Sequence, residues 1–153
     1  MQWTKEHVLM AVAQRVGMEG VNIDGDNFVG MNLAGANMPG VKFIGAEMSG
    51  VNFNEANLAG ADFAVATLRN SRFVYSNLTG ADFSFSDLSW ANLRGAKLTG
   101  AKLTWTDMEG ADLTGADLCS TDLNSATLYG ARYSASTKWP DGFDPFEAGA
   151  VLV

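Results

Sequence analysis

The sequence contains few of the residues that catalytic, metal-binding or disulfide-linked proteins need. Its 153 residues include one cysteine, Cys119, one histidine, His7, and three prolines. A single cysteine excludes an intramolecular disulfide, and one cysteine with one histidine supplies too few ligands for the usual metal sites. We therefore expect no metal and no cofactor. A free thiol suits a reducing compartment, so we expect the cytoplasm as the location.

Long apolar runs and a positive charge balance are also missing. The longest apolar run near the N-terminus, VLMAVA at residues 8–13, is shorter than the roughly 7–15 residues of a secretory core or the about 20 of a membrane helix. We expect no signal peptide, no transmembrane segment and no membrane partner. The net charge of −7 disfavours direct binding to nucleic acid. The length fits one compact domain.

What the sequence has instead is a five-residue repeat. From Val21 to Ala135 it divides without insertion into 23 units, such as ANLAG, ANLRG and ADLTG. The third position is always large and apolar, and the first is usually small. Because side chains alternate along a strand, positions one and three face inward together, whereas the others face outward or turn the chain. The repeat therefore predicts an all-β solenoid.

These units resemble the pentapeptide-repeat family. The resemblance implies a right-handed quadrilateral β-helix with four units per coil, so 23 units give about six coils. It predicts inward columns at 20-residue intervals, one of which is Ile23, Phe43, Phe63, Phe83, Leu103 and Leu123. We divide the chain into an N-terminal α-helical cap (1–20), the β-helix (21–135) and a C-terminal capping tail (136–153).

The N-terminal segment is predicted to close the first coil, where a stacked sheet would otherwise leave open edges. Residues 3–17 are typical of an amphipathic helix that begins after the N-cap Thr4 and ends at Gly17. A helix that binds a partner is the alternative. The residues expected to form this cap are Trp3, Val8, Leu9 and Val12.

The C-terminal tail resembles the T-x-W-P-x-G-F-D-P ending of many cyanobacterial members of the family. It is rich in turn-forming residues, with Pro140, Gly142 and Pro145 between aromatic side chains. We expect Trp139 and Phe143 to fold back over the last coil and cap it. The resemblance also points to a cyanobacterial source.

The fifth position of each unit forms a corner, and glycine occupies it in 13 of the 23 units. Pro39–Gly40 is typical of a type II turn, whose second central residue has a positive φ. The other ten units end on larger residues, which are strained at positive φ, so we expect their corners to differ. Val65, Phe85 and Trp105 lie 20 residues apart on one such edge, here named the aromatic corner. The coil spacing of about 4.8 Å allows contact between neighbouring rings along it.

The outer surface holds the candidate functional residues, because no catalytic constellation, phosphate-binding glycine loop or obvious pocket is recognisable. We expect no enzyme. The side between the aromatic corner and the Trp90 corner bears Arg69, Asp87, Asp107 and Glu109 and is here named the acidic side. An aromatic ridge beside acidic groups is typical of a protein interface. The candidate partner-binding residues are Tyr75, Phe85, Asp87, Trp90, Trp105, Asp107 and Glu109. The alternative is that the rings lie flat on the coils and stiffen their corners, and that the polar side chains are only solvated.

The leading hypothesis is a non-enzymatic interaction or regulatory scaffold that presents this aromatic and acidic surface to an unidentified protein partner. The alternative is a DNA mimic that binds a type II topoisomerase (gyrase), as the quinolone-resistance branch of the family does. That branch resembles DNA as a dimer joined through C-terminal helices. Here the tail predicts no helix, and Arg72, Lys97, Lys102 and Arg132 interrupt the acidic columns. We therefore expect a monomer rather than a dimer.

Overall fold

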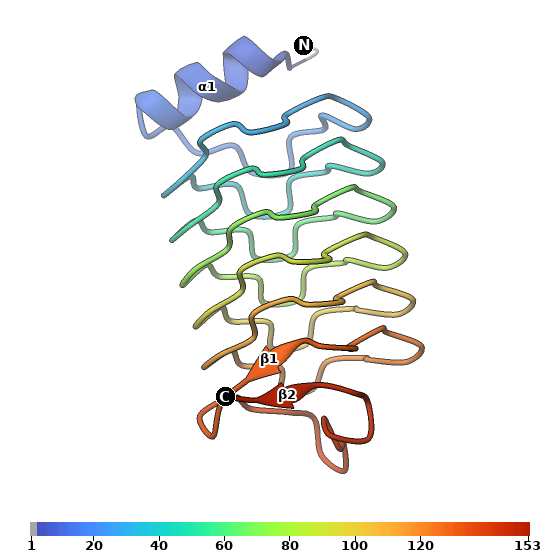
Figure 1. Ribbon diagram of the computed structural model, residues 1–153. Coiled ribbons are helices and arrows are strands. Elements are labelled where there is room, and N and C mark those ends of the chain that lie inside the picture. Colours follow the sequence, from blue (N-terminus) through green and yellow to red (C-terminus); the bar gives the residue numbers. More distant parts are fainter. Residues whose placement is uncertain (1–2) are drawn as a thin grey trace.

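The five-residue units close into four-sided coils that stack along one axis. The computed structural model describes residues 3–153. Second-position residues pair in parallel with the residue 20 positions later, from Asn22 with Lys42 to Asp112 with Arg132. Four such rungs occur in every 20 residues, one on each side of the coil (Figure 1). The predicted quadrilateral β-helix is confirmed.

Backbone hydrogen bonds between successive coils hold each side. The N–H of Phe63 donates to the carbonyl of Asp82 at 2.7 Å, and the N–H of Asp82 donates to Ala61 at 2.9 Å. Most sides contribute a single isolated bridge of this kind. Among the described residues, two bridges run together only at the C-terminal end, where strand β1 (Arg132–Tyr133) pairs in parallel with strand β2 (Val151–Leu152).

Third-position side chains fill the axis. From Ile23 to Leu118 each of them is at most 3 % exposed. Phe43, Phe63 and Phe83 form one column, with ring centroids 5.3 and 4.9 Å apart and interplanar angles of 17° and 3°. The column forms because the coil spacing of about 4.8 Å matches an aromatic stacking distance. Burying each of these side chains contributes roughly 1.5–3 kcal/mol.

The corners keep one conformation whether or not they end on glycine, so the prediction of different corners was wrong. Nine of the ten non-glycine corners have φ between 56° and 61°, close to the 63–71° of the glycine corners. A left-handed residue costs about 1–2 kcal/mol in strain, but a different corner would break the rungs on both sides of it. The nine residues are Glu55, Val65, Asn70, Tyr75, Phe85, Trp90, Trp105, Ser120 and Ser125.

Helix α1 (Lys5–Ala13) lies across the N-terminal end of the stack (Figure 1). The Thr4 side chain accepts the N–H of His7, and the His7 side chain accepts the N–H of Thr4, which forms a capping box. The helix ends four residues earlier than Gly17. Arg15 takes the left-handed conformation, with φ of 56°, and Val16 donates to Ala11 in a Schellman-type end.

The cap residues of α1 only partly match the prediction. Val8 is fully buried, and Val12 and Trp3 pack against the core. Leu9, also expected in the cap, is 41 % exposed and is not among the side chains packed against the core. The buried neighbour of Val8 is Ala11, because the side chains that face the core from a helix lie three and four residues apart.

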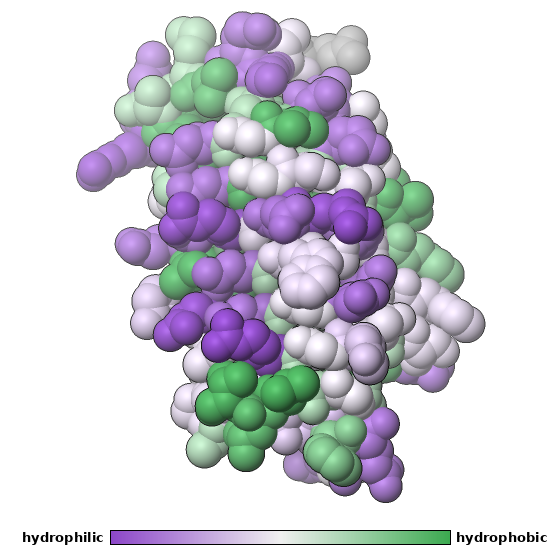
Figure 2. All heavy atoms as spheres, viewed as in Figure 1, coloured by the Kyte–Doolittle hydropathy of each residue, from purple (hydrophilic) through white to green (hydrophobic). Residues whose placement is uncertain are grey.

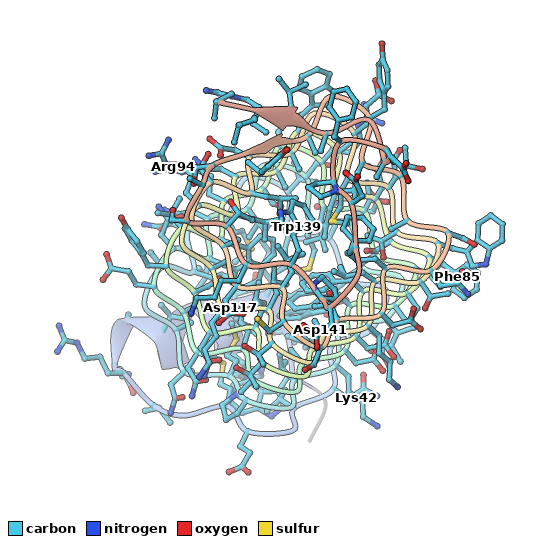
Figure 3. The ribbon with its side chains drawn as sticks, turned by 90° about the horizontal axis from the view of Figure 1, so that it is seen from below. Lys42, Phe85, Arg94, Asp117, Trp139 and Asp141 are labelled. Atoms are coloured by element: carbon cyan, nitrogen blue, oxygen red, sulfur yellow. The ribbon has the colours of Figure 1, made fainter. Side chains whose placement is uncertain are left out.

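The tail extends the coils beyond residue 135. Lys138 pairs with Asp117, a separation of 21 residues, so one inserted residue precedes this rung. The insertion places Trp139 at an inward position, where its ring packs on Phe143 with centroids 5.2 Å apart and an interplanar angle of 26°. Both rings pack against the core cluster. Figure 3, a view along the axis, shows Trp139 inside the outline of the coils.

Candidate protein-interaction surface

The aromatic corner projects into solvent. Val65, Phe85 and Trp105 are 61, 62 and 61 % exposed. Figure 3 shows Phe85 extending outward from the wall of the stack, away from Trp139 at its centre. Within residues 3–153, Phe85 and Trp105 form no ring pair with each other or with another aromatic residue. The contact that the coil spacing allows along this corner is therefore not made.

Tyr75 and Trp90 are placed differently, because each of their rings lies over a glycine in the next coil. A Cβ atom added to Gly95 would clash with the Tyr75 ring, and one added to Gly110 would lie 2.5 Å from the Trp90 ring. The missing glycine side chains leave the space that the rings occupy. These two aromatics therefore brace neighbouring coils, although they remain 71 and 56 % exposed.

The acidic side holds two carboxylates in different electrostatic settings. Asp87 accepts hydrogen bonds from Ser89 and forms an ion pair with Arg69, whose Nη1 lies 3.1 Å from Asp87 Oδ2. Asp107, on the next rung, accepts the backbone N–H of Glu109 at 2.9 Å. In the described part of the chain, neither Asp107 nor Glu109 forms an ion pair. The uncompensated charge on this side therefore lies at the level of Trp105.

Sequence reasoning missed the role of asparagine and aspartate at the second position of the units. Their Oδ1 atom repeatedly accepts a hydrogen bond from the N–H two residues later. The N–H of Ala64 donates to Asp62 at 3.0 Å, and the N–H of Asn54 donates to Asn52 at 3.0 Å. This Asx-type bond supports the turn into each corner. The signal was present in the sequence as the repeated Asn or Asp two residues before the fourth position. These side chains serve the fold as well as the surface.

Hydrogen bonds, assisted by neighbouring cations, hold two of these aspartates in their charged form. Partial burial alone would raise the pKa of Asp82, but hydrogen bonds from Ser84 and the Lys102 ammonium, 3.4 Å away, outweigh burial and lower it. Burial likewise opposes the hydrogen bonds that Asp112 accepts from Thr114, and the net effect again lowers its pKa. Both carboxylates therefore prefer ionisation more strongly in the folded chain.

Cys119 is a free thiol beside the Asp117 carboxylate. The backbone N–H of Cys119 donates to Asp117 at 3.0 Å, and this bond, assisted by Lys138, lowers the pKa of Asp117. The hydrogen bond between the thiol and the Asp117 carboxylate in turn raises the pKa of Cys119. Because the thiolate is the nucleophile, a raised pKa disfavours nucleophilic chemistry at this position.

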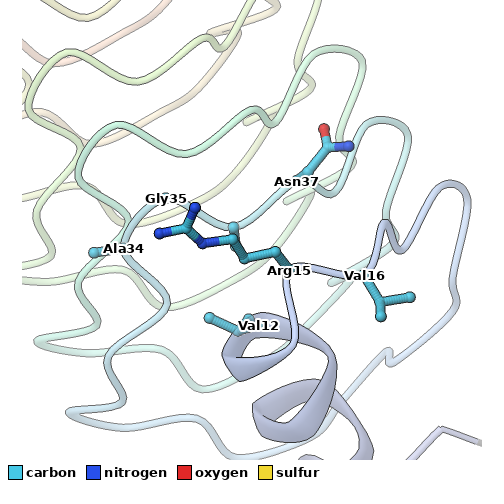
Figure 4. A pocket seen from close by; sticks show the side chains of 7 residues that line it. Val12, Arg15, Val16, Ala34, Gly35 and Asn37 are labelled. Atoms are coloured by element: carbon cyan, nitrogen blue, oxygen red, sulfur yellow. The ribbon is translucent and has the colours of Figure 1, made fainter.

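Cavities lie at both ends of the stack. One of about 320 Å³ lies between the end of α1 and the first coil (Figure 4). Another of about 390 Å³ lies beside Trp139 and Asp141 under the tail. No group of three or more His, Cys, Asp or Glu side chains within residues 3–153 is arranged to hold a metal ion. The first cavity is lined by Val12, Arg15, Val16, Ala34, Gly35, Ala36 and Asn37.

The C-terminal end carries an exposed apolar patch that the sequence did not predict. Figure 2 shows apolar side chains gathered at the end of the stack where β2 lies. Val151, Leu152 and Val153 are 49, 62 and 56 % exposed. Leu152 pairs with Tyr133 in the rung, but no later coil of the described chain covers it.

In the described chain, no helix has the length and apolar character that a membrane crossing would require.

The rungs, the filled axis and the four corners of each coil define a repeat protein of the β-helix class. The chain belongs to the Pentapeptide repeats family, which matches it in eight copies over residues 18–50, 46–84, 61–100 and 96–132. The coils are therefore right-handed. Members of the family are generally structural or interaction proteins without enzymatic activity.

Solved structures of the family resemble this one. The pentapeptide repeat protein Rfr23 from the cyanobacterium Cyanothece 51142 is 26 % identical, with a TM-score of 0.57 over 89 % of this chain and 99 % of its own. HetL, involved in heterocyst differentiation regulation in the cyanobacterium Nostoc sp. strain PCC 7120, is 17 % identical. It has a TM-score of 0.50 over 97 % of this chain and 92 % of its own, and at this identity it shows the fold alone. A search of curated proteins found no significant match.

Proposed function

We propose that the protein is a non-enzymatic interaction scaffold that binds a protein partner through its aromatic corner. The observation that carries the proposal is the backbone strain at this corner. Val65, Phe85 and Trp105 hold φ values of 61°, 61° and 56°, which glycine adopts without strain at thirteen other corners. Their side chains are largely exposed, and the next coil offers each of them no corner glycine to lie over. Strain without an internal benefit is typical of residues retained for binding.

The corner also has the size and chemistry of an interface centre. Three large apolar side chains are exposed at the same corner of successive coils, and aromatic residues dominate the binding energy of many interfaces. The β-helix supports them rigidly, since rungs hold both sides of each corner. Tyr75 and Trp90 fit the corner-stiffening alternative better, because their rings cover glycines of the next coil. We therefore place Phe85 and Trp105 at the centre of the proposed interface.

The surface charge gives the DNA-mimic alternative little support. Four aspartates of the outer columns are ion-paired, with side-chain exposures of 17–30 %. A mimic of duplex DNA needs rows of free negative charge, whereas lysine and arginine pair with these four aspartates. Strand β2 also occupies the C-terminal end, where the proposed mimic would need a dimerising helix. We expect the protein to be a monomer located in the cytoplasm. Sedimentation measurements on the purified protein test its oligomeric state.

Affinity capture from an extract of the cells that make the protein tests the interface. Wild type is compared with a Phe85→Gly/Trp105→Gly variant, which gives two corners the residue that thirteen others already have. The control is Phe146→Ser, which removes an aromatic side chain that is 78 % exposed in the C-terminal tail. We expect proteins that wild type and the control recover and the corner variant loses. Equal recovery by all three would refute the proposed interface.

A further inference from the structure

Two tryptophans flank the free carboxylates of the acidic side in one coil. Trp105 occupies the corner at which this side of the coil begins, and Gly110 occupies the corner at which it ends. The ring of Trp90, from the preceding coil, lies over Gly110. Asp107 and Glu109 therefore lie on a side of the coil that has Trp105 at one corner and the Trp90 ring over the other. The sequence does not show this arrangement, because it depends on Trp90 reaching into the next coil.

These groups have the chemistry that recognises an organic cation. Indole faces attract cations, and carboxylates complete the charge pairing. Neither Asp107 nor Glu109 has a cationic partner in the part of the chain that the structure describes, whereas Asp87 on the preceding rung is already paired with Arg69. The hydrogen bond from the N–H of Glu109 fixes the Asp107 carboxylate in place. The Asp107 carboxylate is therefore held by the backbone, and the charge of both carboxylates is uncompensated.

We propose that the partner is a basic protein segment that places an arginine on the acidic side, between Trp105 and Trp90 and against Asp107 and Glu109. This proposal rests on the interaction function proposed above and names the chemistry of the partner. Arginine fits better than lysine because its planar guanidinium stacks on aromatic rings and binds carboxylates through two hydrogen bonds. The net charge of −7 also attracts a basic segment over longer distances and disfavours a second copy of this chain as the occupant.

The tryptophan side chains report binding directly. The chain has four, so its ¹H–¹⁵N spectrum contains four indole N–H signals, from Trp3, Trp90, Trp105 and Trp139. The probe is an end-blocked peptide of three Gly-Ser-Arg units, and its control replaces each arginine with the neutral isostere citrulline. We expect the arginine peptide to shift the Trp90 and Trp105 signals and leave the other two in place. The citrulline peptide should shift none of them.

Matched variants show whether the two carboxylates carry the binding. In Asp107→Asn/Glu109→Gln, the amide oxygen introduced at position 107 can still accept the N–H of residue 109, so the turn is kept. The control Asp62→Asn/Asp122→Asn changes the net charge equally and keeps the corresponding bonds to Ala64 and Asn124. We expect the first variant to bind the peptide about fivefold to tenfold more weakly and the control to bind like wild type.

Three results would overturn the arginine site: no shift of Trp90 and Trp105, equal shifts of all four signals, or wild-type affinity in Asp107→Asn/Glu109→Gln. Affinity capture separates this proposal from the interaction function. A partner lost with Phe85→Gly/Trp105→Gly but retained by Asp107→Asn/Glu109→Gln would leave the interface standing and refute the arginine site. Specific indole shifts without any corner-dependent partner would leave the arginine site standing and refute the aromatic corner as the interface.

Discussion

Replacing Gly110 with alanine tests whether Trp90 braces two coils. The new methyl group would meet the Trp90 ring at about 2.5 Å and displace it. Gly100→Ala is the matched control, because Gly100 has a similar φ of 71° but no atom within 4 Å of the added Cβ. Both substitutions introduce the strain of a left-handed alanine, and only Gly110→Ala also disturbs a ring.

The structure gives the size of the difference. Left-handed strain, partly offset by the lower entropy of an unfolded alanine, costs about 1 kcal/mol at either corner. Trp90 is 56 % exposed, so about 44 % of an indole residue of roughly 250 Å² is covered. Uncovering half of that area costs about 1 kcal/mol more. We expect Gly110→Ala to lower the free energy of unfolding by about 2 kcal/mol and Gly100→Ala to lower it by about 1 kcal/mol.

Urea unfolding followed by circular dichroism measures these values, and repeating both substitutions in a Trp90→Ser background isolates the ring. Serine already stands at φ of 58° and 60° at Ser120 and Ser125, so the background keeps the corner. Without the indole, the cost of Gly110→Ala should fall to that of Gly100→Ala, a coupling of about 1 kcal/mol. An equal cost of Gly110→Ala in both backgrounds would refute the bracing role of Trp90.

Three further changes test the corners, the axis and the surface charges. Val65→Gly should raise the urea midpoint and increase the free energy of unfolding by about 1 kcal/mol, because a β-branched residue is strained at φ of 61°. An unchanged midpoint would mean that Val65 carries no strain. Leu98→Ala, fully buried, should cost about 2–5 kcal/mol in thermal unfolding, whereas Leu152→Ala, 62 % exposed, should cost less than about 1 kcal/mol; similar costs would contradict the assigned axis. The pKa values of Asp82 and Asp112 are lowered in the folded chain. Their ionised forms therefore stabilise the fold above the unfolded pKa of about 3.9, and this stabilisation is lost as the pH falls through the folded pKa. Asp82→Asn should therefore reduce the loss of stability that accompanies acidification, measured by unfolding at a series of acidic pH values. An unchanged pH dependence of stability would contradict the stabilising role of the Asp82 carboxylate.

The sequence predicted the axis well because one physical rule governs it. A large apolar residue fills the axis at the third position, and a residue that is usually small lets the backbone close at the first. The columns through Phe63 and Leu98 therefore followed from spacing once four units were assigned to a coil. The number of sides and the handedness came from the family resemblance, because alternation alone distinguishes inward from outward positions.

The ends and corners were harder to predict because global constraints override local preference there. Arg15 ends α1 in a left-handed conformation that the sequence would assign to Gly17. Val65 stays left-handed because rungs on both sides of its corner fix the backbone, and losing them would cost more than the strain. In the tail, one inserted residue shifts Trp139 into an inward position, and a repeat without insertions does not predict that shift.

The division of the exposed aromatics into two groups follows from the residue 20 positions later. Tyr75 and Trp90 are followed at that distance by glycine, which leaves room for a ring, whereas Phe85 is followed by Trp105. An aromatic residue paired with a glycine one coil later can offset its backbone strain through contact with the next coil. An aromatic residue without such a glycine lacks this compensation. The 20-residue spacing therefore separates structural corner aromatics from candidate binding residues, and it leaves Phe85 and Trp105 as those whose strain the fold itself does not explain.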